Sequence, residues 1–369
     1  MRHAWLGLIP LLAATGCPLD PDATWDFSRR PDPSLVAEQT QCFLEPVQGS
    51  EIFHSARCSP VLHPQDLDHG GWESFGLTEF DVETVTVLGG VFYRLYYSAG
   101  GADVDQAVGM ATADDGVSLR RYQQNPVIQP PAGADRAHLA CTALDRLAQT
   151  YHAWFRVEDG SLRHATSLDG LAWELDGAGP VSGLLSAQDD GLTQILSCDA
   201  WHDGESLRML VGGRFGATGD GIHAIGESAS DDGINFEPVD SWIYVANAGS
   251  PWQGGGVGFP SRVAWGDQEF LFHVGGGAWD DADPLAPVVD SPRIGVASRT
   301  GGEGPYELHM ANALPLPFDG AAPVRVRAAP AGEWAMLYVR DVYVGPTNIE
   351  QDAIGLMAAY LPALAEEGS

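Results

Sequence analysis

Five acidic residues stand close to predicted β-strands and could act together on a substrate: Glu79, Asp81, Glu83, Asp135 and Asp199. Two neighbouring carboxyl groups can divide the work of bond cleavage. One is protonated and releases a leaving oxygen, while the other is ionised and attacks the substrate or activates water. The alternative is that these side chains cap strand ends or face solvent, as acidic residues usually do. Both interpretations require knowing which elements position the carboxyl groups.

Two tryptophans occur in similar contexts, Trp72 before a Ser-Phe-Gly segment and Trp252 before a Gly-rich segment. Aromatic rings suit the C–H-rich faces of sugars, and Arg262 further along could bind a hydroxyl pair or a carboxylate. We therefore predict Trp72, Glu79, Trp252 and Arg262 as substrate-binding residues. The alternative for each tryptophan is packing within the core.

A repeated phrase indicates the elements that hold these residues. Residues 108–116 and 225–233 align without a gap, and shorter copies occupy residues 163–170, 294–299 and 354–359. The copies lie roughly 60 residues apart, a spacing typical of repeat arrays and propellers. Equivalent positions in the five copies are Gly109, Arg163, Gly226, Gly295 and Gly355.

Each copy follows an alternating, strand-like run, and its Asp-Gly pair suits a tight hairpin to a further strand. An aromatic residue follows in three copies: Trp173, Phe236 and Tyr306. Four antiparallel strands in each of five units predict an all-β fold, a five-bladed β-propeller of four-stranded blades. The predicted propeller spans residues 72–361, with blades at about 72–130, 131–184, 185–250, 251–318 and 319–361.

The N-terminus predicts export. An apolar stretch follows Arg2, and the segment ending at Cys17 resembles the lipobox of bacterial lipoproteins. Residues 1–16 would then be a lipoprotein signal peptide, 17–35 a lipidated Cys17 with a Pro/Asp-rich tether, and 36–71 an N-terminal segment. Residues 362–369 form a C-terminal tail. This places the protein in the bacterial cell envelope, lipid-anchored and facing the periplasm or the exterior; an ordinary signal peptide is the alternative.

Four cysteines remain if Cys17 carries lipid, and an oxidising compartment favours pairing them. Cys42 with Cys58 would close a short loop. Cys141 and Cys198 precede comparable strands of the second and third units, so we predict a bridge between neighbouring blades. Two buried free thiols are the alternative for the second pair. The spacings disfavour zinc.

The charge balance excludes several partners and chemistries. The chain carries 50 acidic and 19 basic residues, a formal charge of −31, so nucleic acid is not expected as a partner, and membrane contact is expected only through the lipid. All the basic residues are arginine, which excludes a Schiff-base or P-loop lysine. No cofactor is expected. Calcium on a cluster of aspartates is a weak alternative to a solvated acidic loop; the cluster is Asp280, Asp281, Asp283 and Asp290.

The Ala-Thr-Ser-Leu-Asp-Gly-Leu-Ala-Trp segment at residues 165–173 and the Asn-Pro-Val-Ile segment at 125–128 carry a family resemblance. Over residues 72–361 the chain resembles the five-bladed propellers of glycoside hydrolase families 32, 43 and 68. The resemblance implies an axial funnel lined by acids from successive first strands. It makes Asp81 or Glu83 the base or nucleophile, Asp135 a modulator and Asp199 the acid.

The catalytic signatures of these families are not matched. The first blade lacks the Asp-Pro of family 43, the third lacks its Glu-Gly-Pro, and neither the Asn-Asp-Pro-Asn nor the Arg-Asp-Pro of family 32 occurs. Two hypotheses follow. The first is a lipid-anchored glycosidase-like propeller that binds, and as an enzyme would hydrolyse, a glycan or polysaccharide in its axial funnel. The alternative is a non-catalytic surface propeller that binds carbohydrate or protein.

Overall fold

The computed structural model describes most of the chain between residues 44 and 367. The described ranges are 44–47, 52–56, 59–64, 72–74, 76–87, 90–101, 104–176, 179–216, 221–246, 250, 252–280, 288–302, 304–309, 314–315, 321–323, 326–344 and 350–367. The predicted signal peptide, tether and Cys17 lie outside these residues, as do Cys42, Cys58, Asp281 and Asp283. No helix in the described ranges is long and apolar enough to cross a membrane.

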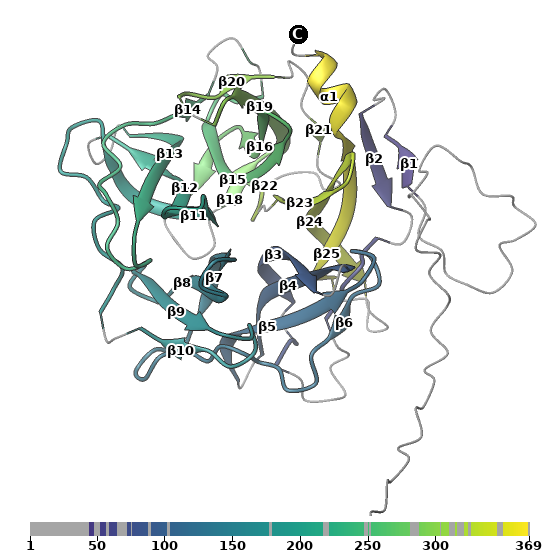
Figure 1. The fold of residues 1–369 in the computed structure, drawn as a ribbon, viewed down its shortest axis with the longest axis vertical. Coiled ribbons are helices and arrows are strands. Elements are labelled where there is room, and N and C mark those ends of the chain that lie inside the picture. Colours follow the sequence, from purple (N-terminus) through teal and green to yellow (C-terminus); the bar gives the residue numbers. More distant parts are fainter. Residues whose placement is uncertain are drawn as a thin grey trace, which may run out of the picture. The chain divides into compact units, whose positions relative to one another are not determined.

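The fold is the five-bladed β-propeller that the sequence predicted, with five antiparallel sheets around a common axis (Figure 1). The first blade comprises β3 (Leu77–Val87), β4 (Gly90–Gly101), β5 (Val104–Ala113) and β6 (Arg120–Arg121). The second comprises β7 (His138–Asp145), β8 (Thr150–Arg156), β9 (Leu162–Ser167) and β10 (Glu174–Leu175). The third comprises β11 (Leu192–His202), β12 (Leu207–Phe215), β13 (Ile222–Ser230) and β14 (Tyr244–Val245).

The fourth blade comprises β15 (Gly256–Trp265), β16 (Gln268–Gly276), β19 (Arg293–Thr300) and β20 (Glu307–Leu308), and β21 (Leu314–Pro315) also pairs with β19. The fifth comprises β23 (Val326–Ala331), β24 (Trp334–Val344) and β25 (Glu350–Tyr360). A small separate sheet contains β17 (Trp279–Asp280), β18 (Val288–Asp290) and β22 (Ala321–Pro323). A short helix, α1 (Leu361–Glu367), follows β25.

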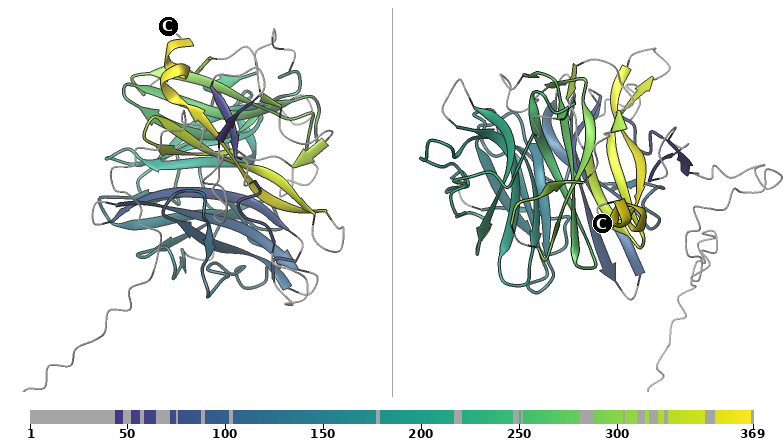
Figure 2. Two further views of the ribbon diagram at one scale, coloured as in Figure 1. Left: turned by 90° about the vertical axis from the view of Figure 1, so that its right-hand side faces the viewer. Right: turned by 90° about the horizontal axis from the view of Figure 1, so that it is seen from above.

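The fifth blade is completed by strands from the beginning of the described chain. β2 (Phe53–Ala56) pairs with β25, and β1 (Leu44–Pro46) pairs with β2. Helix α1 lies beside β2 (Figures 1 and 2), where Leu361 and Leu364 share a hydrophobic cluster with Phe53. The propeller is therefore closed by residues far apart in sequence, which joins its two chain ends in one sheet.

The five equivalent residues of the repeat occupy equivalent positions in the blades. Each lies on the third strand, opposite a residue of the second strand: the pairs are Gly109–Tyr97, Arg163–Phe155, Gly226–Val211, Gly295–His273 and Gly355–Val339. The repeat therefore identifies the same position on the third strand of every blade. This regularity allows first strands from different blades to present corresponding backbone groups to the axis.

The Asp-Gly turns lock neighbouring blades together. In each of three copies the aspartate accepts hydrogen bonds from two backbone N–H groups, and the glycine has a positive φ; the glycines are Gly116 at 73°, Gly170 at 72° and Gly233 at 75°. The glycine carbonyl then accepts a bond from an aromatic side chain of the preceding blade. The donors are the Tyr338 hydroxyl, the Tyr96 hydroxyl and the Trp154 indole.

Cys141 of β7 and Cys198 of β11 form a disulfide, with Cα atoms 5.5 Å apart. The predicted bridge between the second and third blades is confirmed. Both residues are fully buried and belong to the hydrophobic cluster between these blades. The bridge therefore joins two innermost strands next to the axis.

Candidate active site

The site is built on the innermost strands β3, β7, β11, β15 and β23, which contact one another in a closed ring. Four of these strands have an irregular register with their second strand, at Leu77/Phe80, Leu139/Cys141, Ile195/Ser197 and Gly258/Ser261. Such bulges interrupt the ladder and re-aim the local backbone. As a result, carbonyl groups of these strands become available to a donor on the axis.

That donor is Arg327 of β23, whose side chain is 1% exposed. Its guanidinium donates to the carbonyls of Phe80 (3.3 Å), Ala140 (2.8 Å) and Pro260 (2.6 Å), and also to that of Cys198. These acceptors belong to the other four blades. Because a guanidinium has five N–H donors in a rigid fork, one side chain can bind all of them. Arg327 therefore ties the five blades together at the axis.

Asp81 is the counter-ion of this arginine. Its Oδ1 lies 3.0 Å from Nε of Arg327 and accepts the Val82 N–H at 2.9 Å. Its Oδ2 accepts the backbone N–H of Thr142 at 2.5 Å and lies 3.1 Å from the Thr142 hydroxyl. Burial raises the pKa of Asp81, and Arg327 with these hydrogen bonds opposes the rise. A buried guanidinium stays charged and requires a nearby anion, so Asp81 is the ionised member of the site.

Glu83 shares the Thr142 hydroxyl with Asp81. The hydroxyl oxygen lies 3.1 Å from Oε1 of Glu83, the same distance as from Asp81, so the two carboxyl oxygens are within twice that distance of each other. Burial and the Asp81 charge raise the pKa of Glu83 to about 8. A hydroxyl has only one proton to donate. It therefore donates to ionised Asp81 and accepts a hydrogen bond from protonated Glu83 at neutral pH.

Asp199 of β11 joins the group from the third blade. Its Oδ2 accepts the backbone N–H of Arg262 at 2.7 Å, and its Oδ1 lies 4.0 Å from Nη1 of Arg327. Burial raises the pKa of Asp199 to about 7, with Arg327 opposing and Asp81 adding to the rise. We call Asp81, Glu83 and Asp199 the acid group. Three of the four predicted catalytic acids thus come together: Asp81 and Asp199 flank Arg327, and Glu83 shares the Thr142 hydroxyl with Asp81.

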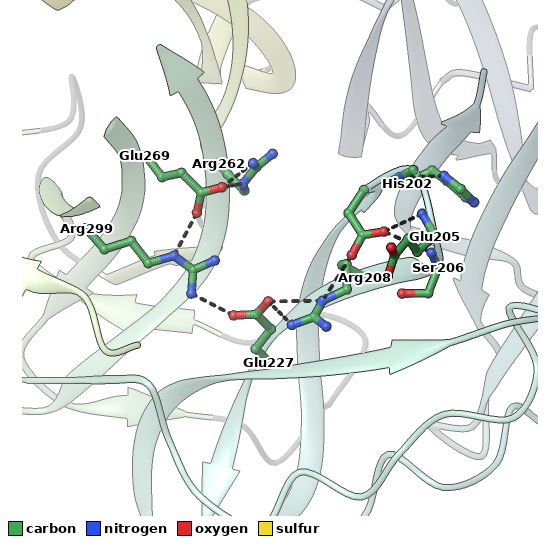
Figure 3. A network of polar contacts seen from close by, with 10 residues as sticks. His202, Glu205, Ser206, Arg208, Glu227, Arg262, Glu269 and Arg299 are labelled. Atoms are coloured by element: carbon green, nitrogen blue, oxygen red, sulfur yellow. Dashed lines mark hydrogen bonds and ion pairs between the residues drawn. The ribbon is translucent and has the colours of Figure 1, made fainter. Parts of the chain in front are cut away.

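The side chain of Arg262, predicted to bind substrate, is held in a network of ion pairs (Figure 3). It donates to Glu269 through Nε at 2.7 Å, and Arg299 binds the other oxygen of Glu269 at 2.7 Å. Arg299 also contacts Glu227 at 2.8 Å, which in turn binds Arg208 at 2.7 Å. This chain of alternating charges connects the third and fourth blades. It fixes the Arg262 backbone, whose N–H holds Asp199.

The opposite side of Arg327 has a different composition. On β3, Glu79 comes before the Phe80 carbonyl that Arg327 binds, and Glu83 comes after it. On β7, His138 comes before the Ala140 carbonyl, and Thr142 comes after it. We call the side of Glu79 the loop end of the axis and the side of Glu83 the hairpin end, because β3 leads from Glu83 into the hairpin with β4. The acid group therefore belongs to the hairpin end.

At the loop end, an oxygen of Glu79 lies 3.6 Å from Nη2 of Arg156, and both residues are buried. His138 lies opposite Arg156 in the ladder. Burial, together with the charges of Arg156 and Arg136, lowers the pKa of His138 to about 3. Within the described residues, neither ring nitrogen of His138 has a hydrogen-bond partner. The loop end therefore combines a compensated carboxylate with a neutral imidazole.

Three other predicted site residues lie elsewhere. Asp135 is exposed, and its backbone N–H donates to the Glu158 carboxylate at 2.7 Å. Trp72 stacks on Tyr97 with ring centroids 5.9 Å apart, over Gly109, where an added Cβ would come within 2.6 Å of the indole.

Trp252 is packed in the same way in the fourth blade. It is buried, stacks on His273 at 5.7 Å and covers Gly295. The two tryptophan contexts recognised in the sequence therefore mark equivalent packing positions over the glycine of a third strand.

Sequence reasoning missed Arg327 and Thr142. Arg327 had a usable signal, because it is a charged residue inside an otherwise apolar strand of a chain with few basic residues. Thr142 had none. Among the residues described, no three His, Cys, Asp or Glu side chains are arranged so that they could hold a metal ion. What the hairpin end can supply is proton transfer, from a protonated Glu83 and an Asp199 that titrates near neutrality.

The sequence matches no protein-family model and no curated protein. Solved structures share its fold. A glycoside hydrolase is 12% identical, with a TM-score of 0.52 over 77% of this chain and 90% of that one. An N-acetylgalactosamine deacetylase from F. plautii, in complex with blood group B trisaccharide, is 13% identical, with a TM-score of 0.53 over 83% and 97%.

An exo-1,5-alpha-L-arabinanase from a bovine ruminal metagenomic library is 14% identical, with a TM-score of 0.50 over 78% of this chain and 94% of that one. At these identities the likeness establishes the fold alone. The chain has the five-bladed propeller architecture of glycoside hydrolase-like proteins.

Proposed function

We propose that this protein is an exported, lipid-anchored glycoside hydrolase that cleaves a glycan at the hairpin end of its axis. One observation carries the proposal: carboxyl groups from two blades converge on Thr142 and Arg327, where the pKa of Glu83 is about 8 and that of Asp199 about 7. Glycosidic cleavage needs one protonated and one ionised carboxyl group, and environments that push pKa values upward supply the first.

The three acids take different roles in this proposal, and those of Glu83 and Asp199 are the reverse of the roles that the family resemblance implied. Glu83 holds a proton at neutral pH and donates it to the leaving glycosidic oxygen. Asp199 ionises near neutrality and serves as the base or nucleophile. Asp81 is 4% exposed and its oxygens are occupied by Arg327, Val82 and Thr142, so it acts as a positioning residue. Its charge keeps Glu83 protonated, and its contacts fix the Thr142 hydroxyl.

The hydrolase proposal is tested by turnover on a panel of polysaccharides. Glu83→Gln and Asp199→Asn remove the acid and the base while preserving size, and each should lower kcat by at least about 100-fold. Asp135→Asn is the matched control, because Asp135 is exposed and makes no contact with the acid group. It should retain wild-type activity. Absence of turnover by the wild type across the panel, or equal activity of all variants, contradicts the proposal.

A second candidate is a non-catalytic glycan-binding propeller. Two observations favour it: the Asp81 carboxylate is occupied by hydrogen bonds, and the Arg262 side chain is bound to Glu269. Such contacts stabilise a rigid axis and do not require catalysis. This candidate predicts saturable binding of a glycan, without turnover, that Glu83→Gln and Asp199→Asn leave unchanged.

The lipid anchor is proposed from the segment that ends at Cys17. Labelled palmitate should enter the wild-type protein in a bacterial host, and the mature protein should partition into detergent. Cys17→Ser should abolish both. Partition of the wild type into the aqueous phase would support an ordinary signal peptide instead.

A further inference from the structure

A pocket of about 390 Å³ lies beside the first blade, outward from the acid group. Arg94 and Phe92 of β4, Thr112 of β5 and Arg120 of β6 line it, together with Tyr122 just beyond β6. Leu171, from the Asp-Gly turn of the second blade, also contributes, so the pocket spans the boundary between two blades. Its volume is in the range of small-ligand sites.

The pocket concentrates positive charge in a strongly acidic protein. Arg94, Arg120 and Arg121 line it, although the whole chain has only 19 basic residues against 50 acidic ones. Arg121 is neutralised, because its Nε lies 2.9 Å from the carboxylate of Glu73. Arg94 and Arg120 have no carboxylate within ion-pair distance in the described part of the chain.

Arg94 is fixed without being neutralised. Its guanidinium donates to the backbone carbonyl of Asp169 and lies over the Tyr151 ring, 4.8 Å from its centroid. The Asp169 carboxylate accepts the N–H groups of Leu171 and Ala172 and forms no ion pair with Arg94, although the Arg94 charge helps these hydrogen bonds to lower the pKa of Asp169. Arg94 lies opposite Glu83 in the ladder, yet protonated Glu83 offers no counter-charge at neutral pH. The Arg94 guanidinium is therefore held in place before a ligand binds, and among the described residues it has no ion-pair partner that a ligand would need to displace.

Arg120 is exposed, and in the described residues its side chain makes no hydrogen bond or ion pair. The same wall carries the Phe92 and Tyr122 rings, the Thr112 hydroxyl and two side-chain amides, Gln123 and Gln124. A guanidinium matches a planar carboxylate in a bidentate manner. Rings, amides and a hydroxyl suit the C–H faces and hydroxyl groups of a sugar.

We propose that this pocket binds an acidic sugar, a uronic acid residue whose carboxylate meets Arg94 and Arg120. The carbohydrate part of this inference rests on the proposed function, and the anionic part rests on the pocket itself. Because the pocket adjoins the strand pair that carries Glu83, it selects glycans with a uronate next to the bond presented to the acid group.

Isothermal calorimetry with a galacturonate trimer tests the inference on the full propeller. Arg120→Gln removes one charge from an exposed side chain, and Arg136→Gln is the matched control, since Arg136 is also exposed and lies outside the pocket. The wild type should bind the trimer, and more weakly as salt rises. Arg120→Gln should raise Kd by about tenfold, equivalent to one lost charge-assisted contact, whereas Arg136→Gln should change it less than about twofold.

A neutral galactose trimer, measured with the same proteins, reports the carboxylate contribution. Its affinity should be weaker and should not respond to Arg120→Gln. Failure of the wild type to bind galacturonate, or equal affinity of the two arginine variants for it, overturns the inference. Glu83→Gln separates this result from the proposed hydrolysis, because it should abolish turnover and preserve uronate binding.

Discussion

The two ends of the propeller axis are built on the same strands but hold opposite electrostatic environments. At the hairpin end, Asp81 and Asp199 flank the Arg327 guanidinium and Glu83 lies beside Asp81, and burial raises the pKa of Glu83 to about 8 and that of Asp199 to about 7. At the loop end, Glu79 is compensated by Arg156 and His138 stays neutral far below its usual pKa. The difference follows from burial, which raises the pKa values of Glu83 and Asp199 and lowers that of His138, and from the charges beside each group.

Arg327 separates the two ends because it fills the axis between them. Its side chain contacts the other four blades, so removing these contacts should have the largest effect on the free energy of unfolding. Arg327→Met leaves Asp81 buried without a counter-ion and four carbonyls without their donor, which should lower the free energy of unfolding by about 4 kcal/mol. Chemical denaturation measures this. Adding Asp81→Asn should recover part of the loss, and a change below about 1 kcal/mol for Arg327→Met contradicts the role of the arginine.

The disulfide should have the next largest effect. Cys141 and Cys198 are 57 residues apart in sequence, and opening that loop should cost about 3 kcal/mol, chiefly by freeing the unfolded chain. The paired replacement Cys141→Ala with Cys198→Ala should therefore lower the denaturation midpoint. A reductant should shift the wild type to the same midpoint and leave the double variant unchanged. Equal stability of both proteins under oxidising conditions is the opposing result.

The hairpin end should lose stability as pH rises. The folded pKa of Glu83, about 8, exceeds its ordinary value of 4.5, so its contribution is fully present below about pH 4.5 and is lost as pH rises through 8. Glu83→Gln removes this titration. The variant should be more stable than the wild type at pH 9 by on the order of 2 kcal/mol, and the advantage should vanish near pH 4. A pH-independent difference between the two proteins argues against a protonated Glu83.

The loop end should show the reverse dependence. The folded pKa of His138, about 3, is below its ordinary value of 6.5, so its contribution is present above 6.5 and is lost as pH falls through 3. His138→Phe removes no hydrogen bond and should be near neutral at pH 8. At pH 4 it should exceed the wild type by about 1 kcal/mol. Thermal unfolding across this range measures it, and a variant that is weaker at both pH values shows that the imidazole has a bonding role.

The fold was readable from the sequence because its signals are local. Asp-Gly turns and a repeated strand pattern recur in each unit, and they correctly predict five blades and the Cys141–Cys198 bridge. The use of β2 to complete the fifth blade was not readable, since Phe53–Ala56 carries no copy of the repeated phrase. Pairing between chain ends depends on closure of the whole ring.

The site was readable only in part. Asp81, Glu83 and Asp199 were identified because the resemblance to glycoside hydrolase propellers implies acids on successive first strands. Their pKa values depend on burial inside the closed ring and on contacts with Arg327 and Thr142, on other blades, and no spacing along the chain encodes either. Trp72 and Trp252 look like sugar platforms in sequence, but their packing over Gly109 and Gly295 depends on third strands that follow later in the chain.

The pKa of the Glu83 side chain tests the central claim most directly. Carbon NMR of protein labelled at glutamate carboxyl carbons, with Glu83→Gln to assign the signal, follows its titration. A midpoint near 8 is predicted from burial and the adjacent Asp81 charge. A midpoint near the ordinary value of 4.5 would mean that Glu83 is ionised at neutral pH, and the hairpin end would then have no carboxylic acid to donate a proton.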